Sequence, residues 1–311
     1  MADLRKTWLG IGCGVVAGAL WGLVFLAPEL ARDFTPLQLA AGRYLAYGLM
    51  AALLLAPRWP KTLARLRMDD WRALVLLSLT GNIIYYLLLA AAVQLAGVAA
   101  ASIVIGFLPV AVSLIGSRED DGAPLARLAP SLLLGGAAVL CIGWSALGAA
   151  QASRPYALIG GLCAVGALIC WTAYAVHNAR HLRRRPDISA HDWNLLTGVV
   201  TGACALALTP FALASDQPHE VAEWLRFAAI VATLAFLASI VGAAFWNQAS
   251  RLLPLSLVGQ MILFETLFAL LYGFLWERRA PSGLEVTAIA LMLASVLSCF
   301  NAHRPRERRH V

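Results

Sequence analysis

Residues 9–26 read LGIGCGVVAGALWGLVFL, an apolar stretch without a single charged side chain. A helix of about 20 apolar residues crosses a hydrocarbon core of roughly 30 Å, so this stretch has the length and composition of a transmembrane helix. Nine comparable stretches follow it along the chain. The ten predicted spans are residues 9–26, 37–55, 73–93, 98–116, 129–147, 157–177, 195–213, 227–246, 255–276 and 284–300.

The composition agrees with a chain that lies in lipid. Hydrophobic residues make up 60% of it and charged residues only 13%, which is too few to cover a soluble core. The net charge of +7 could suggest a nucleic-acid-binding protein, but the basic residues lie between the spans and not on one soluble face. We therefore predict an all-α integral membrane protein that binds no nucleic acid.

The cysteines and the N-terminus give no sign of other chemistry. All six cysteines lie in apolar runs and none forms a C-x-x-C pair, so we interpret them as packing residues and expect no metal or cofactor. Arg5 and Lys6 precede the first apolar stretch as in a signal peptide, yet no convincing cleavage site follows. This stretch is predicted to be a retained first helix.

The basic residues predict the orientation of the helices. If the N-terminus is cytoplasmic, only Arg32, Arg154, Arg226, Arg278 and Arg279 lie outside. Cytoplasmic loops of inner-membrane proteins are enriched in Lys and Arg, so we predict a multi-pass protein of the bacterial inner membrane with both termini in the cytoplasm. The residues assigned to the cytoplasm are Arg5, Lys6, Arg58, Lys61, Arg65, Arg67, Arg72, Arg118, Arg127, Arg180, Arg183, Arg184, Arg185, Arg251, Arg304, Arg306, Arg308 and Arg309.

An internal repeat divides the chain into residues 1–153 and residues 154–311, the second ending in the basic tail. A shift of 150 residues aligns Trp21 with Trp171, and shifts of 154 and 157 align later segments in the same order. Each half holds five predicted spans, an odd number, so the second half enters the membrane in the opposite direction. This predicts two inverted five-helix repeats around a central cavity, an arrangement that supports alternating access.

These features resemble the EamA-type members of the drug/metabolite transporter superfamily over nearly the full chain. The resemblance rests on residues 18–22 (GALWG), 35–38 (TPLQ) leading to Arg43, 107–109 (FLP), 264–266 (FET) and 276–278 (WER). Many members have a Glu-Pro pair in spans four and nine, whereas this chain keeps only Pro109 in the first and Glu265 in the second.

The aromatic content and the layout look most like the bacterial aromatic amino acid exporters. That resemblance implies export of amino acids, aromatic and of broader range, by a secondary transporter. An exporter of another small metabolite or drug is the alternative. The motifs leave the exact substrate, the energy source and the oligomeric state open.

Arg43 and Glu265 are the charged side chains well inside the predicted spans. A charge at that depth costs roughly 2.5 to 3.5 kcal/mol on insertion scales, so each needs a partner or water. They are predicted either to flank a polar cavity or to serve as structural hydrogen-bonding groups between helices. If Glu265 faces the cavity, it could exchange a proton or meet a substrate ammonium group.

Four uncharged residues complete the predicted substrate site. Asn82 and Tyr86 are four residues apart, which places them on one face of a helix in mid-membrane. Trp171 and Gln260 add an aromatic surface and a second amide. We expect a mainly apolar cavity in which a few amides orient the ligand.

The sequence lacks the motifs that other classes of function require. The chain has no phosphate loop, metal-ligand cluster or nucleophile elbow, so no catalytic residue is assigned. An intramembrane lipid-modifying enzyme would need carboxylates or histidines clustered at one depth. A channel would also fit an inverted repeat, but its flux would not depend on alternating conformations.

Overall fold

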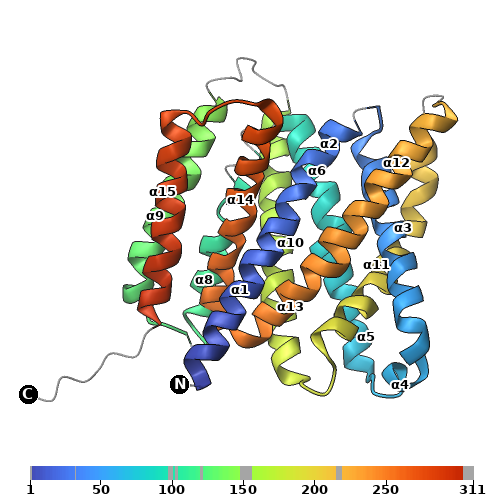
Figure 1. Ribbon diagram of the computed structural model, residues 1–311, viewed down its shortest axis with the longest axis horizontal. Coiled ribbons are helices and arrows are strands. Elements are labelled where there is room, and N and C mark those ends of the chain that lie inside the picture. Colours follow the sequence, from blue (N-terminus) through green and yellow to red (C-terminus); the bar gives the residue numbers. More distant parts are fainter. Residues whose placement is uncertain are drawn as a thin grey trace, which may run out of the picture.

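The computed structural model describes residues 2–31, 33–96, 101, 104–119, 122–147, 156–214 and 219–303, and all regular structure in these ranges is helical (Figure 1). The longer helices of the N-terminal part are α1 (Ala2–Gly22), α3 (Pro36–Leu55), α5 (Met68–Ser78), α6 (Ile84–Ala96), α8 (Leu108–Gly116) and α9 (Leu125–Leu147). Those that follow are α10 (Ala157–Arg184), α11 (Ala190–Ala214), α12 (Val221–Leu234), α13 (Ala243–Leu252), α14 (Leu255–Glu277) and α15 (Gly283–Ala302). Short helices α2 (Ala27–Leu30) and α4 (Trp59–Leu63) lie in connections.

Eight helical segments are long and apolar enough to cross a membrane. They correspond to every predicted span except the fourth and fifth. The fourth span, residues 98–116, lies partly outside the described residues, and the fifth corresponds to α9. The prediction of an all-helical membrane protein is confirmed, while the count of ten spans stays a prediction.

Two helices, α3 and α15, begin with reciprocal caps. The Thr35 hydroxyl accepts a hydrogen bond from the Gln38 backbone N–H at 3.2 Å, and the Gln38 side chain accepts one from the Thr35 N–H at 2.7 Å. Ser282 and Glu285 form the same reciprocal arrangement at the start of α15. Such caps satisfy the backbone donors that the first turn of a helix leaves free.

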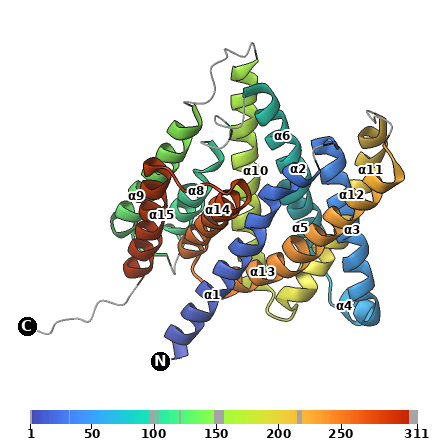
Figure 2. The ribbon, with the colours of Figure 1, turned by 45° about the horizontal axis from the view of Figure 1, so that its top comes forward.

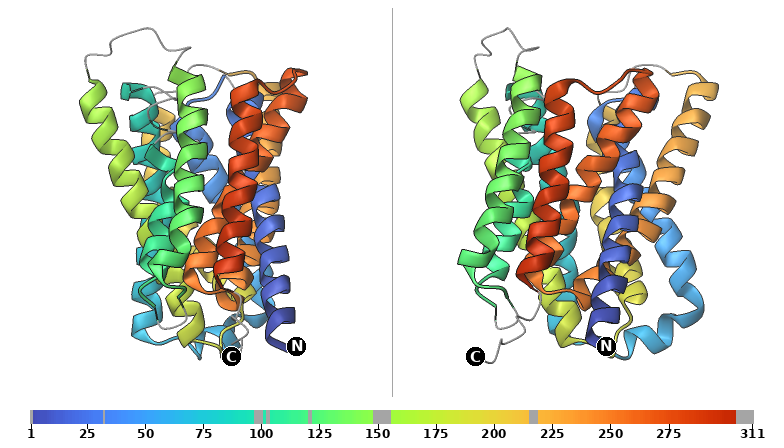
Figure 3. Two further views of the ribbon diagram at one scale, coloured as in Figure 1. Left: turned by 90° about the vertical axis from the view of Figure 1, so that its left-hand side faces the viewer. Right: turned by 60° about the vertical axis from the view of Figure 1, so that its left-hand side comes forward.

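The helices pack in pairs that join distant parts of the chain. Helix α3 packs on α11, α9 on α15, α6 on α10 and α8 on α14, while α1 lies against both α13 and α14. The α9/α15 pair forms one edge of the body, and α3, α11 and α12 form the opposite edge (Figures 1 and 2). The start of α1 and the end of α15 lie on the same side, as both views of Figure 3 also show.

That side carries most of the described basic residues, and we call it the basic face. Arg43 lies within α3, between the two ends of the body. At the end opposite the basic face, the described lysines and arginines are Arg226, Arg278 and Arg279. The basic face also contains α4 and the turn between α10 and α11 (Figure 1). The asymmetry expected from the sequence is therefore present in three dimensions.

A row of glycines allows α1 to approach α14 closely. A Cβ atom on Gly14 would lie 2.6 Å from the Met261 side chain, and one on Gly18 would lie 2.9 Å from the Glu265 backbone nitrogen. Small residues at such a row let two membrane helices pack backbone against backbone. The contact at Gly18 fixes the backbone of Glu265 against α1.

Two π-helical segments interrupt the long helices, η3 (Leu79–Ile83) between α5 and α6 and η4 (Ala235–Gly242) between α12 and α13. A π segment disturbs the regular hydrogen-bond ladder, so its backbone groups need other partners. In η4 the Trp21 indole N–H donates to the Ala238 carbonyl at 3.0 Å, and the Asn194 amide donates to the carbonyls of Ser239 and Ile240. These bonds tie α1 and α11 to the irregular segment.

Candidate functional site

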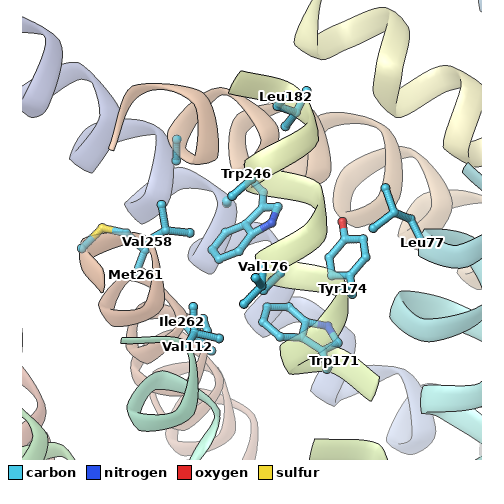
Figure 4. Packing of buried hydrophobic residues seen from close by; sticks show 14 of the residues in the cluster. Leu77, Val112, Trp171, Tyr174, Val176, Leu182, Trp246, Val258, Met261 and Ile262 are labelled. Atoms are coloured by element: carbon cyan, nitrogen blue, oxygen red, sulfur yellow. The ribbon is translucent and has the colours of Figure 1, made fainter. Parts of the chain in front are cut away.

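Three tryptophans from three helices meet in the middle of the body. Trp171 of α10 lies 6.1 Å from Trp21 of α1 and 5.7 Å from Trp246 of α13, measured between ring centroids. The Trp21 and Trp246 rings are 5.1 Å apart. Figure 4 shows Trp171 and Trp246 beside α10, with the Tyr174 ring next to them. We call Trp21, Trp171 and Trp246 the tryptophan cluster.

Tyrosines extend this aromatic surface toward α3 and α6. Tyr174 lies 5.7 Å from Trp171, and a Cβ atom on Gly81 of η3 would lie 2.3 Å from the Tyr174 ring. Only glycine leaves room for the ring there. On α3, Tyr44 meets Tyr86 of α6 edge to face at 6.4 Å.

The two charged residues predicted inside the membrane lie beside these tyrosines. Arg43 donates from Nε to the Ser239 hydroxyl of η4 at 3.3 Å, and its guanidinium lies 5.6 Å from the centre of the Tyr44 ring. Glu265 lies within electrostatic reach of Arg43 and of Tyr85. Among the described ion pairs none joins Arg43 to Glu265 within 4.0 Å, so the two charges interact without direct contact.

The structure brings Arg43, Tyr86, Trp171 and Glu265 into one neighbourhood, and it gives the two predicted amides other neighbours. The Asn82 amide, in η3, donates to the Thr201 hydroxyl of α11 at 3.3 Å. Gln260 is 1% exposed, donates to the Ser113 hydroxyl at 3.2 Å and accepts from Ser295 at 2.8 Å. In this conformation Gln260 therefore links α14 to α8 and α15, and its predicted role in binding stays a prediction.

Two polar groups at the tryptophan cluster lack a partner within the described part of the chain. They are the indole N–H of Trp246, which is 1% exposed, and the hydroxyl of Thr172, which neighbours Trp171 in sequence. A buried donor without an acceptor costs free energy of about 1 to 3 kcal/mol. The Trp246 N–H thus has no acceptor among the described residues and is available to one that enters the site.

Sequence reasoning overlooked Trp21 and Ser239 as members of this neighbourhood. Trp21 was noted only as the repeat counterpart of Trp171 and as part of the GALWG motif. Residues that correspond across a pseudo-two-fold axis can meet at that axis, so their alignment was a usable signal. No sequence signal pointed to Ser239, because its contact with Arg43 depends on how η4 packs against α3.

Both halves of this chain match one family of transporters. The model of the EamA-like transporter family matches residues 8–117 and 158–300. The chain belongs to this family. The resemblance to the drug/metabolite transporter superfamily is thereby confirmed, and at the family level the chain is a membrane transporter and not an enzyme.

One relative is an inner membrane protein, YtfF of Escherichia coli strain K12. The two are 33% identical over 306 residues, which cover 94% of this chain and 95% of the relative. A solved crystal structure with 20% identity matches with a TM-score of 0.75 over 95% of this chain and 99% of the other. At that identity the structural match concerns the fold alone. This inner membrane relative and the apolar helices place this chain in the inner membrane as a multi-pass protein.

Below the tryptophan cluster, a network of charges ties helices together at the basic face. Asp70 is 1% exposed and accepts a hydrogen bond from Arg185, while its other oxygen lies 3.0 Å from His181 Nε2. Glu119, in the turn after α8, pairs with Arg180 at 2.7 Å and with Arg183. We call these residues, together with Asp187, the basic-face network.

The ionisation of Asp187 and Glu119 supports these pairs. Hydrogen bonds from Arg185 lower the pKa of Asp187 to about 2, although some burial opposes this. Burial raises the pKa of Glu119, but hydrogen bonds from Arg180 and Arg183 outweigh it and the pKa lies below its ordinary value. Both carboxylates are therefore charged at neutral pH and hold their arginines in place.

Removing the charge of Asp70 tests how much this network stabilises the folded protein. We expect Asp70→Asn to lower the free energy of unfolding by about 3 kcal/mol, because it removes the buried counter-charge of Arg185 and leaves only Asp187, which is 51% exposed. Denaturation of the purified protein in mixed micelles measures this.

The neighbouring Asp69→Asn is a matched control. Asp69 forms an ion pair with Arg72, and both side chains are exposed, at 85% and 76%. Exposed pairs contribute about 0 to 1 kcal/mol, so this variant should unfold almost as the parent does. Equal unfolding midpoints for the two variants would show that the Asp70 pair has no special structural role.

Proposed function

We propose that this chain exports amino acids, aromatic ones included, by alternating access. One observation carries the proposal: an aromatic surface from α1, α10 and α13 lies next to a cation on α3 and an anion on α14. An amino acid presents the complementary set, a carboxylate, an ammonium group and a side chain. The proposed pairs are the substrate carboxylate with Arg43 and the ammonium group with Glu265.

The surroundings suit such a zwitterion. Arg43 and Glu265 do not neutralise each other directly, so each retains capacity to bind an opposite charge. The free Trp246 N–H offers a further donor for the carboxylate. Rings of Trp171 and Tyr86 supply a surface that accepts varied side chains, since aromatic packing is tolerant of shape.

We also propose that residues 1–153 and 154–311 form two inverted repeats around a central cavity. In this repeat α1 corresponds to α10, and α6 corresponds to α13. The contact of α1 with α13 in one half therefore has a counterpart in the contact of α10 with α6. The same exchange relates η3 to η4, and each of these packs a glycine under an aromatic ring, Gly81 under Tyr174 and Gly242 under Trp21. These correspondences support the repeat.

In this proposal the basic-face network is the contact that breaks when the protein opens toward the basic face. It links the start of α5 and the turn after α8 to the end of α10. Both of its main contacts therefore join the two proposed repeats. Movement of one repeat against the other would separate Asp70 from Arg185 and Glu119 from Arg180.

The proposed orientation places the basic face in the cytoplasm, with both termini there. In a cysteine-free background, we expect a cysteine at exposed position 281 to react with a membrane-impermeant maleimide on intact cells. A cysteine in place of Arg127, on the basic face, should react only after permeabilisation. The reverse pattern of labelling would overturn this orientation.

Transport in liposomes tests the substrate class. Vesicles with the purified protein should exchange labelled tryptophan or phenylalanine faster than empty vesicles, and Trp171→Ala should weaken aromatic relative to aliphatic substrates about fivefold, the value of one aromatic contact. Trp276→Ala is the control, because Trp276 is 52% exposed at the end of α14. Transport of other metabolites but of no amino acid would favour the alternative substrate classes. Identical preferences for both variants would remove Trp171 from the site.

Replacement of Glu265 separates an ionisable role from a packing role. Glu265→Gln keeps size and hydrogen bonding, so we expect normal insertion with transport reduced about tenfold or more, from loss of one charge-assisted hydrogen bond. The pH dependence of the flux should also flatten. Glu223→Gln, at a carboxylate that is 42% exposed, is the control. A Glu265 variant with the parent's rate and pH profile would make this residue structural.

A further inference from the structure

A cavity of about 320 Å³ opens between α5 and α10 at the basic face. Its two walls differ in chemistry. Helix α5 contributes apolar side chains, among them Leu76 and Leu77, and α10 contributes His177, Arg180 and Arg184. The volume lies within the range of sites that hold small ligands.

This cavity faces away from the tryptophan cluster. Arg180 follows Trp171 by nine residues, about two and a half turns, so the two side chains leave α10 on opposite sides. Leu162 precedes Arg180 by 18 residues, about five turns, and therefore shares its side of the helix. Leu162 and Ile169 are 64% and 62% exposed, as expected of side chains that contact lipid. The basic wall thus continues the lipid-facing side of α10.

The positive charge of this wall is only partly compensated. Arg180 pairs with Glu119, but Arg184 and His177 have no hydrogen-bond or ion-pair partner within the described part of the chain. Asp70 lies 3.0 Å from His181, which also lines the cavity, and it is paired with Arg185. An anion entering the cavity would meet Arg184 without displacing any existing partner.

The depth of the cavity matches the polar boundary of the bilayer. Arg184 is the last residue of the apolar segment Leu158–Arg184, and the segment that contains α5 begins at Met68. Leu76 is 43% exposed beside the basic wall and offers a surface for a hydrocarbon chain. Basic pockets between membrane helices at this level suit anionic lipid headgroups.

We propose that this cavity binds the phosphate headgroup of an acidic phospholipid, with Arg184 and Arg180 on the phosphate and an acyl chain along Leu76. The combination of one apolar wall and one basic wall is why we choose a phospholipid over a small anion as the ligand. A small soluble anion would use the arginines but gain nothing from the leucines, whereas a phospholipid uses both. The site lies on the opposite side of α10 from the proposed amino-acid site.

Native mass spectrometry of the full-length protein, delipidated in detergent, measures this binding directly. We expect phosphatidylglycerol to bind more tightly than phosphatidylcholine of the same acyl chains. Arg184→Ala should weaken phosphatidylglycerol binding about fivefold, the value of one arginine near an anionic headgroup, and leave phosphatidylcholine binding unchanged. Arg184→Lys should retain most of the preference, because it keeps the charge.

Arg127→Ala is the matched control. Arg127 is an exposed arginine on the same face but lies outside the cavity. Equal loss of phosphatidylglycerol binding in the Arg127 and Arg184 variants would show that only the overall charge matters and would overturn the proposal. Displacement of the lipid by millimolar inorganic phosphate would also overturn it, in favour of a soluble-anion site.

Discussion

The backbone of this protein must satisfy its hydrogen bonds without water, and the rest of the structure depends on that constraint. Helices satisfy it almost everywhere. Where the helix becomes a π segment in η4, side chains of other helices take the exposed carbonyls, Trp21 from α1 and Asn194 from α11. These hydrogen bonds do more than satisfy the carbonyl groups of η4. They fix α1 and α11 around η4, and so place Trp21 and Ser239 next to Trp171 and Arg43.

The same low polarity separates charges that stabilise the fold from charges that we propose bind the substrate. Asp70 at the basic face is buried and contacts both Arg185 and His181. A buried carboxylate without such partners would destabilise the fold. Arg43 and Glu265 are treated differently. Arg43 has only a neutral hydroxyl and a tyrosine ring close to it, and Glu265 has no ion pair among the described contacts. Incomplete compensation of these two charges is what the proposed site for a zwitterion requires.

Small residues determine how closely these groups approach each other. Gly18 brings α1 onto the backbone of Glu265, and Gly48 meets Gly202 where α3 crosses α11. Gly81 and Gly242 make room for the rings of Tyr174 and Trp21. A larger residue at any of these positions would push two helices apart. Close helix contact and aromatic contact therefore depend on the same few glycines.

The sequence by itself determined what lies in the membrane and which end is basic, because apolar length and the placement of arginines are properties of single segments. It also predicted a site that includes Trp171, Arg43 and Glu265, because a charge at that depth is costly and Trp171 offers an aromatic surface. Only the tertiary structure decided that Trp21 joins Trp171, that Gln260 bonds to Ser113 and Ser295, and that Arg180 faces away from the site. Those outcomes depend on which helix lies beside which, and hydrophobic periodicity shows that a face is buried without showing what buries it.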